Sequence, residues 1–414
     1  MSESPRVTRR RLLAGGAAIA AAGAGAYGVT RASEAGPAPI PVGDQPDGLP
    51  ARQFAWNAFL HQDRFGNAVP PRHDRLLFFD VIGRRSEGHR TRLEAALRTL
   101  ERRFSWGPEG LLFTVGWGHH YFGRASERAA PIPAARALSN FELPAIDDYD
   151  MVLHLAADDE DRLRSVENAL THGAEIDGLH GRADLSEVLA WRETRTGFTG
   201  AGLPAAHQDV GGIPSGRPVP ADAPLFMGFK SALKHNQATE DSITIADGPY
   251  ADGTTMAVSY MRLRLDSWYQ DLDEDQRVAR MYAPQMTPEQ VRRVRTDAPG
   301  DPKLLGQAIR RYGVIGHSQT SARARRHGKP IILRRDFDTI DGGQAGLHFV
   351  SLQRSIEDFV RTRTAMNAAS AQLQNPAITD TDNNGINEFI FVLKRGNYLL
   401  PSRARRSFPD TVSA

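Results

Sequence analysis

Residues 311–354 read RYGVIGHSQTSARARRHGKPIILRRDFDTIDGGQAGLHFVSLQR, and this stretch says most about the fold. It places His317 in a polar turn, followed by a basic segment. Two short apolar runs follow; the first ends in paired arginines and the second in Gln353. Short apolar runs closed by charged or turn-forming residues are typical of β-strands. The stretch therefore predicts a histidine placed before two strands, with arginines at the end of the first strand.

The paired arginines, Arg334 and Arg335, are expected to have different surroundings. Adjacent side chains of a strand point to opposite faces, so only one of the two can enter a shared pocket. An inward-pointing guanidinium needs an anionic partner, because burying an unpaired charge is costly. The other arginine is expected to be an ordinary salt-bridged strand residue.

The folded region repeats one pattern of strands and helices twice. The first half predicts strands at 75–82, 111–117, 150–156 and 188–192, with helices at 89–104 and 160–171. The second half predicts strands at 255–263, 330–335, 346–352 and 388–393, with helices at 272–281 and 355–367. Both halves read β-α-β-β-α-β, the ferredoxin-like order. We therefore expect an α+β chain with ferredoxin-like domains at 51–205 and 206–414, after a linker at 36–50.

The amino-terminus predicts export. Residues 8–13 read TRRRLL, which fits the twin-arginine pattern, and an Ala- and Gly-rich stretch follows. Small residues near position 35 suit a signal peptidase, so residues 1–35 are expected to be a twin-arginine signal peptide and the protein to be extracellular or in the cell envelope. The rival reading is a membrane anchor, whose apolar stretch of ~18 residues would be close to the lower limit for spanning. Its Ala and Gly content would drive insertion only weakly.

Composition excludes several classes of function. The chain has no cysteine, which rules out disulfides, thiolate metal sites and a cysteine nucleophile. The formal net charge of +2 comes from the basic leader, so the rest is near neutral and no nucleic-acid partner is expected. The closing basic segment at 403–406 is interpreted as a solvated face.

Several motifs together resemble the dye-decolourising peroxidases over roughly residues 50–408. They are the 311–354 segment, LLFTVGWG at 111–118, the strand at 151–158 and GINEF at 385–389. The resemblance implies a dimeric α+β barrel formed by two ferredoxin-like units of one chain, with haem b as cofactor. It also implies that His317 ligates the haem iron and that Arg334 lies on the opposite, peroxide-binding face. An acid should hold the other nitrogen of the His317 ring; Asp382 is favoured over Asp380 and Glu388.

The chain departs from this family at one motif. Where most members have Gly-Phe-x-Asp-Gly, residues 228–232 read GFKSA, so Ser231 replaces the distal aspartate. That aspartate is the family's candidate acid–base group, and a serine cannot take over a carboxylate's proton transfer near neutral pH. Ser231 can still position a water molecule. The acids that would substitute if their loop folded back are Glu240, Asp241, Asp247 and Asp252.

The leading hypothesis is thus an exported haem oxidoreductase that uses peroxide, or altered chemistry at the same iron. The alternatives are a haem or iron carrier without turnover, and a cofactor-free relic of the fold with a binding role. A Soret band separates the relic from the other two, and peroxide-dependent turnover separates enzyme from carrier. The expected partners are hydrogen peroxide, a small-molecule reductant, the twin-arginine export machinery and, optionally, further copies of the chain in a homo-oligomer.

Overall fold

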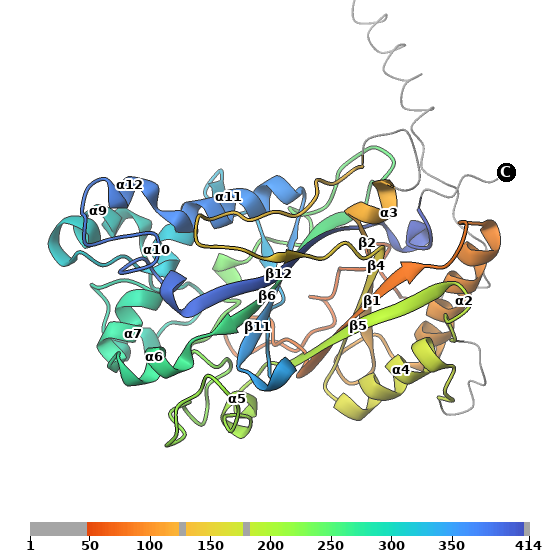
Figure 1. The fold of residues 1–414 in the computed structure, drawn as a ribbon, viewed down its shortest axis with the longest axis horizontal. Coiled ribbons are helices and arrows are strands. Elements are labelled where there is room, and N and C mark those ends of the chain that lie inside the picture. Colours follow the sequence, from red (N-terminus) through yellow and green to blue (C-terminus); the bar gives the residue numbers. More distant parts are fainter. Residues whose placement is uncertain (1–47, 124–129, 177–182, 410–414) are drawn as a thin grey trace, which may run out of the picture.

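The computed structural model describes residues 48–123, 130–176 and 183–409 (Figure 1). The expected signal peptide at 1–35 and most of the linker at 36–50 lie outside these residues. Within the described ranges, no helix combines the length and apolar character needed to cross a membrane.

The first half of the fold contains the expected elements. Its strands are β1 (His73–Val81), β2 (Leu112–Gly118), β4 (Met151–Ala157) and β5 (Leu189–Phe198), and its main helices are α2 (Glu87–Arg103) and α4 (Glu160–His172). Ser86 caps α2, and Asp159 caps α4 by accepting hydrogen bonds from backbone N–H groups of its first turn. Minor elements of this half are α3 (His119–Gly123), β3 (Ala145–Ile146) and α5 (Leu203–Ala206).

The second half keeps the same order but has a longer first crossover. Its main elements are β6 (Thr254–Leu263), β9 (Leu333–Arg334), β11 (Gly346–Gln353), α11 (Ile356–Asn367), α12 (Ala369–Gln372) and β12 (Ile390–Leu400). The expected single helix at 272–281 is one of several crossover elements: α6 (Leu265–Gln270), α7 (Glu274–Met281), α8 (Pro288–Arg292), α9 (Leu305–Gln307) and α10 (His317–Ser321).

The predicted strand at 330–335 is divided, which corrects the sequence expectation. Its first residue, Pro330, belongs to β8 (Lys329–Pro330), which forms a small hairpin with β7 (Arg325–Arg326). The only part of the predicted strand that joins the main sheet is β9, which pairs with β11 through Leu333 and Arg334. Pro330 has no N–H to donate to a ladder, so a strand through this position is weak.

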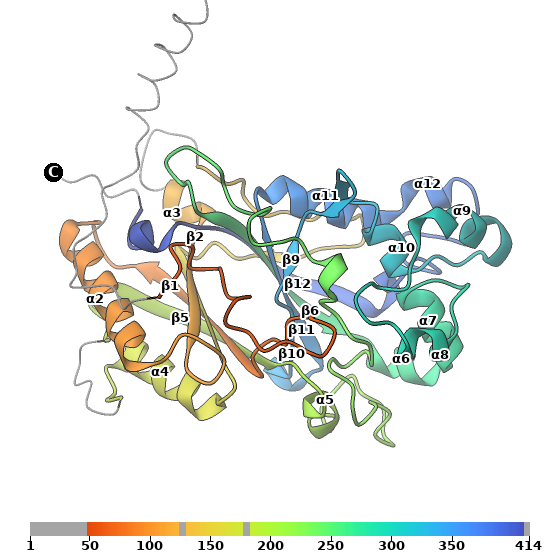
Figure 2. The same cartoon turned by 180° about the vertical axis from the view of Figure 1, so that it is seen from behind.

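The strand order identifies two ferredoxin-like units in one barrel. The order β5-β1-β4-β2 in the first half and β12-β6-β11-β9 in the second is the same 4-1-3-2 arrangement. The halves join where β2 pairs with β12, and again where β10 (Phe337–Thr339) pairs with both β11 and β5. Figure 2 shows β9, β10 and β11 together in the middle of the molecule. The predicted α+β barrel of two ferredoxin-like units is confirmed.

Strands near the middle of the barrel are buried on both faces. In β1, Leu77 and Phe79 pack with the apolar face of α2, whereas Leu76 and Phe78 belong to a second cluster with residues of β6, β11 and β12. Helices α2 and α4 cover the outside of the first half, and the helices of the second half lie at the other end (Figure 1).

The carboxy-terminal arginines are part of the core, not a solvated face as the sequence suggested. Arg406 is fully buried and donates to Glu101 at 2.6 Å and to Glu94 at 3.1 Å, both on α2. Arg403 is also buried and pairs with Glu101. These ion pairs fix the end of the second half against the first half.

Candidate functional site

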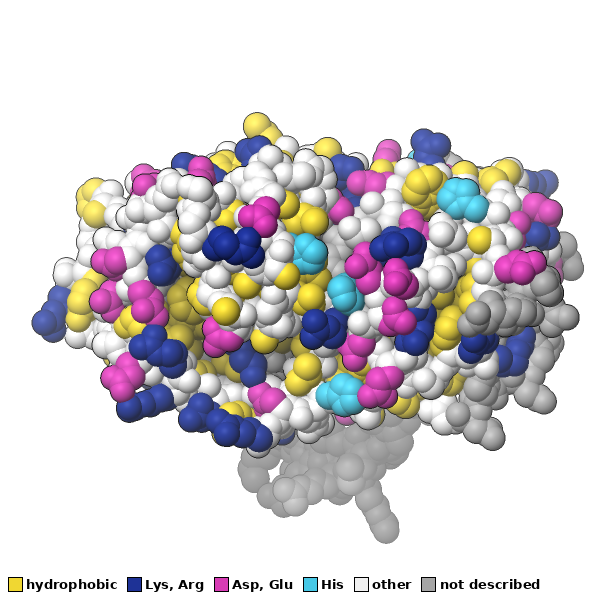
Figure 3. Space-filling model, turned by 90° about the horizontal axis from the view of Figure 1, so that it is seen from below, with side chains coloured by type: hydrophobic (Ala, Val, Ile, Leu, Met, Phe, Trp, Pro, Cys, Tyr) yellow, Lys and Arg dark blue, Asp and Glu magenta, His cyan; other side chains and the backbone are white. Residues whose placement is uncertain are grey.

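A largely apolar cavity opens in the second half, among β6, β11, β12 and the long crossover. It contains about 1550 Å³ of empty space, a figure that includes the open solvent at its mouth. Seen from below, this half of the molecule carries a recessed patch of hydrophobic side chains edged by Lys and Arg (Figure 3). The apolar lining includes Leu225, Met227, Phe229, Met261, Met281, Ile331, Ile332, Phe349, Phe359 and Ile390.

His317 lines this cavity from the start of α10. Two glycines allow the chain to place it there. A Cβ on Gly316 would lie 1.8 Å from the Tyr282 carbonyl oxygen, and Gly385, at φ +57°, packs against the His317 backbone. Burial, with smaller contributions from nearby arginines, lowers the pKa of His317 to about 3. The imidazole is therefore neutral at ordinary pH, the form in which histidine binds metals.

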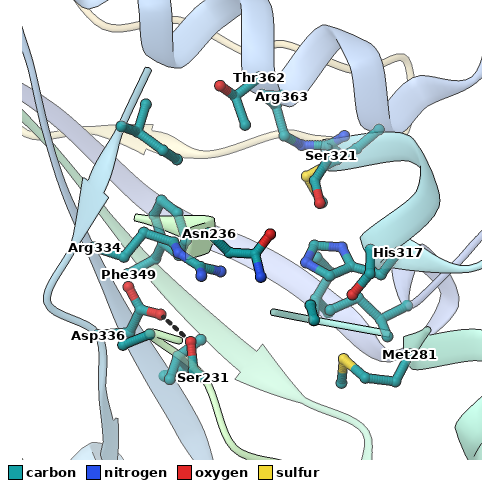
Figure 4. Close-up of a pocket in the computed structure, with 18 of the residues that line it drawn as sticks. Ser231, Asn236, Met281, His317, Ser321, Arg334, Asp336, Phe349, Thr362 and Arg363 are labelled. Atoms are coloured by element: carbon teal, nitrogen blue, oxygen red, sulfur yellow. Dashed lines mark hydrogen bonds between the residues drawn. The ribbon is translucent and has the colours of Figure 1, made fainter. Parts of the chain in front are cut away.

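Arg334 points into the same cavity from β9 (Figure 4). Figure 4 shows its guanidinium directed toward His317, with Asn236 between them in that view. Gln237 Oε1 accepts hydrogen bonds from Arg334 N at 3.0 Å and from Arg334 Nε at 3.4 Å. Among the described residues, Arg334 has no ion-pair partner within 4.0 Å, so its charge is available to a bound molecule.

Arg335 points to the opposite face. Its guanidinium lies 4.0 Å from the centre of the Trp56 ring and donates to Glu240 at 3.2 Å. It is thus the salt-bridged neighbour, and Arg334 is the member of the pair that faces the cavity.

Asp336 is a cavity residue that the sequence analysis missed. It lies two positions after Arg334, and Ser231 Oγ donates to its Oδ2 at 3.4 Å. Burial raises the pKa of Asp336 to about 6, although Arg334 and Ser231 act in the opposite direction. Asp338 follows on the same face, accepts from Phe226 N at 2.5 Å and has a pKa raised well above the ordinary value by burial. Because alternate residues of an extended segment point the same way, Asp336 and Asp338 share the cavity face with Arg334.

The acids expected to substitute for the distal aspartate do not reach the cavity. Glu240 accepts hydrogen bonds from Trp56 N at 2.8 Å and Asn57 N at 2.9 Å, in addition to its contact with Arg335. Asp241 and Asp252 both pair with Arg52 at the surface. Asp247 is exposed and does not line the cavity either.

Asp382 does not contact His317 in this structure. Its carboxylate is exposed and accepts from Thr381 Oγ1 at 3.2 Å. Asp380 and Glu388 are engaged with Gln372 and Arg280. Across the described part of the chain, no hydrogen bond of the His317 ring is found. The loop that carries these acids instead reaches the histidine segment through its backbone, where Gly385 N donates to Ile315 O at 2.9 Å.

The polar groups of the cavity fit a haem. Within the described ranges, buried polar atoms of four lining residues have no hydrogen-bond partner: Asn236 Nδ2, Arg363 Nη2, Asp336 Oδ1 and Asp338 Oδ1. Two of these atoms, Asn236 Nδ2 and Arg363 Nη2, are donors; unpaired buried donors are costly, so they indicate a ligand with acceptors. A porphyrin would place its apolar rim on the hydrophobic walls, its iron at a neutral imidazole and its carboxylates near Arg363.

The barrel and its cavity define a class of protein: the chain has the fold of the dye-decolourising, DyP-type peroxidases. It is similar to a DypB variant of Rhodococcus jostii RHA1 in complex with heme, with 14% identity, a TM-score of 0.56, and 86% of this chain and 99% of that chain covered. It is also similar to a DyP-type peroxidase from Cellulomonas bogoriensis, with 19% identity, a TM-score of 0.52, and 88% of this chain and 94% of that chain covered. A dye-decolorizing protein from V. cholerae is similar to it with 14% identity, a TM-score of 0.52, and 85% of this chain and 99% of that chain covered. At these identities, the likeness establishes the fold.

The family is shown by sequence. Residues 71–402 match the model of a family of unknown function, DUF7405, and the chain belongs to that family. A comparison with curated protein sequences finds no match.

Proposed function

We propose that the protein is an exported, haem-dependent oxidoreductase of the peroxidase type. The observation that carries the proposal is that a neutral histidine, His317, and an arginine free of ion pairs among the described residues, Arg334, both point into one apolar cavity (Figure 4). The fold shared with DyP-type peroxidases supports it.

His317 would hold the haem iron, since burial keeps its imidazole neutral and able to donate a lone pair. Arg363 would hold a haem carboxylate. Its Nε donates to Glu142 at 2.8 Å and its Nη1 to Asn367 at 2.6 Å, while Nη2 is buried and has no partner among the described residues. When bound, haem b would supply the two electrons that cleave the peroxide O–O bond and recover them from a small-molecule reductant.

Arg334 would act on the peroxide. Negative charge develops on the departing oxygen as the O–O bond lengthens, and a fixed guanidinium in an apolar cavity stabilises that charge. The bonds to Gln237 fix the direction of Arg334, so little reorganisation is needed when peroxide enters.

Export by the twin-arginine pathway completes the proposal, and it depends on the sequence of residues 8–13. That pathway carries folded proteins, so a cofactor can be inserted before the chain leaves the cytoplasm.

The test is to titrate the haem-free protein with hemin and then to add hydrogen peroxide and a dye or phenol. The proposal predicts a Soret band that saturates at one haem per chain and peroxide-dependent oxidation of the reductant. Saturable haem binding without turnover would support the carrier hypothesis instead, and absence of haem binding would refute both.

A further inference from the structure

We propose that Asp336 is the acid–base group of this site, so that the carboxylate missing at Ser231 is supplied by the segment that closes the barrel. The inference rests on the proposed function and names a residue that would perform its proton transfer.

The position of Asp336 supports this role. It lies between β9 and β10, and it shares the cavity face with Arg334 because alternate residues of an extended segment point the same way. Figure 4 shows its carboxylate beside Ser231 and below the Arg334 guanidinium. Oδ2 accepts from Ser231, whereas Oδ1 is buried and has no hydrogen-bond partner among the described residues. One carboxylate oxygen is therefore held and the other is available to a ligand.

The serine is complementary to this aspartate. A carboxylate at position 231 would place two acids side by side, and such a pair cannot readily ionise together. A hydroxyl at that position instead donates to Asp336 and favours its ionised form. The serine at position 231 thus suits an ionisable acid at position 336 better than a second carboxylate would.

In the proposed reaction, Asp336 would move one proton from one peroxide oxygen to the other, so that no proton is gained or lost overall. The Asp336 carboxylate would accept a proton from one peroxide oxygen, and the resulting carboxyl would give that proton to the other oxygen. A bound haem would supply the two electrons for cleavage of the O–O bond, and the oxygen that receives the proton would leave as water. Asp336 ends in its starting state, while Arg334 stabilises the charge between the steps.

The surroundings of Asp336 keep its pKa in a range that is useful for proton transfer. A general base is most efficient when its pKa lies near the working pH, and burial moves Asp336 toward that range. Asp338 is the nearest acid along the segment, and burial raises its pKa well above the usual value, which favours its uncharged form. The titratable and charged groups that line the cavity with Asp336 are Lys230, Tyr282, His317, Arg325, Arg334, Asp338, Arg363 and Arg395.

The test uses the hemin-loaded full chain and cyanide, which enters as HCN and must give its proton to a base when it binds. Asp336→Asn should leave the Soret band in place, lower the cyanide association rate about 10²-fold and slow the reaction with peroxide by a similar factor. The double variant Ser231→Asp/Asp336→Asn should recover much of both rates, because the carboxylate returns to the other side of the same pair. Asp222→Asn, at an exposed site outside the cavity lining, is the matched control and should change neither rate.

A second readout needs no haem. In the haem-free protein, carboxyl carbon NMR should show one aspartate that titrates near pH 6 in the wild type and is missing from Asp336→Asn. Unchanged cyanide and peroxide rates in a haem-loaded Asp336→Asn protein would overturn the inference. Failure of the wild type to bind hemin would instead overturn the proposed function.

Discussion

The Ser231 hydroxyl donates to the Asp336 carboxylate across 3.4 Å, and this contact joins a surface loop to the segment that closes the barrel. The loop carries the motif in which most dye-decolourising peroxidases have an aspartate. The cavity contains a carboxylate at Asp336, which lies two residues after Arg334.

Asp336 should lower the stability of the haem-free protein at neutral pH. Its pKa is about 6 in the folded state against 3.8 as the ordinary value, so between these pH values the folded state holds a proton that the unfolded state has released. Stability should fall as pH rises through this window and stay lower above it. Asp336→Asn should therefore raise the free energy of unfolding by about 1–3 kcal/mol at pH 7.5 and by little at pH 4, measured by urea unfolding.

The Ser231→Ala variant serves as the counterpart for this prediction. It removes a hydrogen bond that favours the ionised carboxylate, so it should destabilise the protein more at pH 7.5 than at pH 4. An Asp336→Asn protein whose stability gain did not depend on pH would show that this carboxyl titrates normally.

Arg334→Ala should lower the rate of reaction with hydrogen peroxide by about 10²–10³ while haem stays bound, because one oriented donor is lost at the site of developing charge. Stopped-flow absorbance of the hemin-loaded protein measures this rate. The exposed Arg323→Ala variant is the control and should react like the wild type. Equal rates for Arg334→Ala and the wild type would favour a haem carrier.

Arg406→Met should destabilise the whole fold. Arg406 is fully buried between Glu94 and Glu101, and removal of one partner from a buried ion pair costs about 3–5 kcal/mol. Chemical denaturation should show a lower midpoint. Arg405→Ala, which loses a hydrogen bond to the Pro249 carbonyl oxygen but no ion pair among the described residues, should have a much smaller effect. Similar losses in both variants would contradict the assigned role of the buried pairs.

Changing Arg9 and Arg10 together to lysine should leave the precursor inside the cell. The twin-arginine machinery distinguishes arginine from lysine, although both side chains carry a positive charge. Cell fractionation and immunoblotting of the wild type and the double variant measure the outcome. Normal export of the double variant would refute this pathway.

Much of the fold was predictable because it depends on local patterns. The apolar face of α2 and the short runs of β1, β2, β4, β6 and β11 follow from spacing alone, and the order of these elements indicates the ferredoxin-like units. The burial of Arg403 and Arg406 was not predictable, since a basic run has the same composition whether it is solvated or paired. Their partners on α2 lie about 300 residues earlier, as the spacing of 305 between Arg406 and Glu101 shows.

The site was only partly predictable for a similar reason. Strand alternation correctly separates Arg334 from Arg335, and it equally places Asp336 in the cavity. The acids of the loop around Glu240 do not serve the cavity, because the Glu240 carboxylate accepts hydrogen bonds from two backbone N–H groups and from Arg335. Nothing in the local sequence shows that Ser231 would meet a residue 105 positions away.

The most direct test of the central claim is the absorption spectrum of the hemin-loaded protein compared with that of His317→Ala. His317 lines the cavity with a neutral imidazole, so the account predicts a Soret band in the wild type that is lost or strongly shifted in the variant. The exposed His327→Ala variant should keep the wild-type spectrum, and circular dichroism should show the same fold in all three proteins. An unchanged Soret band in a folded His317→Ala protein would contradict the claim that this histidine holds the haem iron.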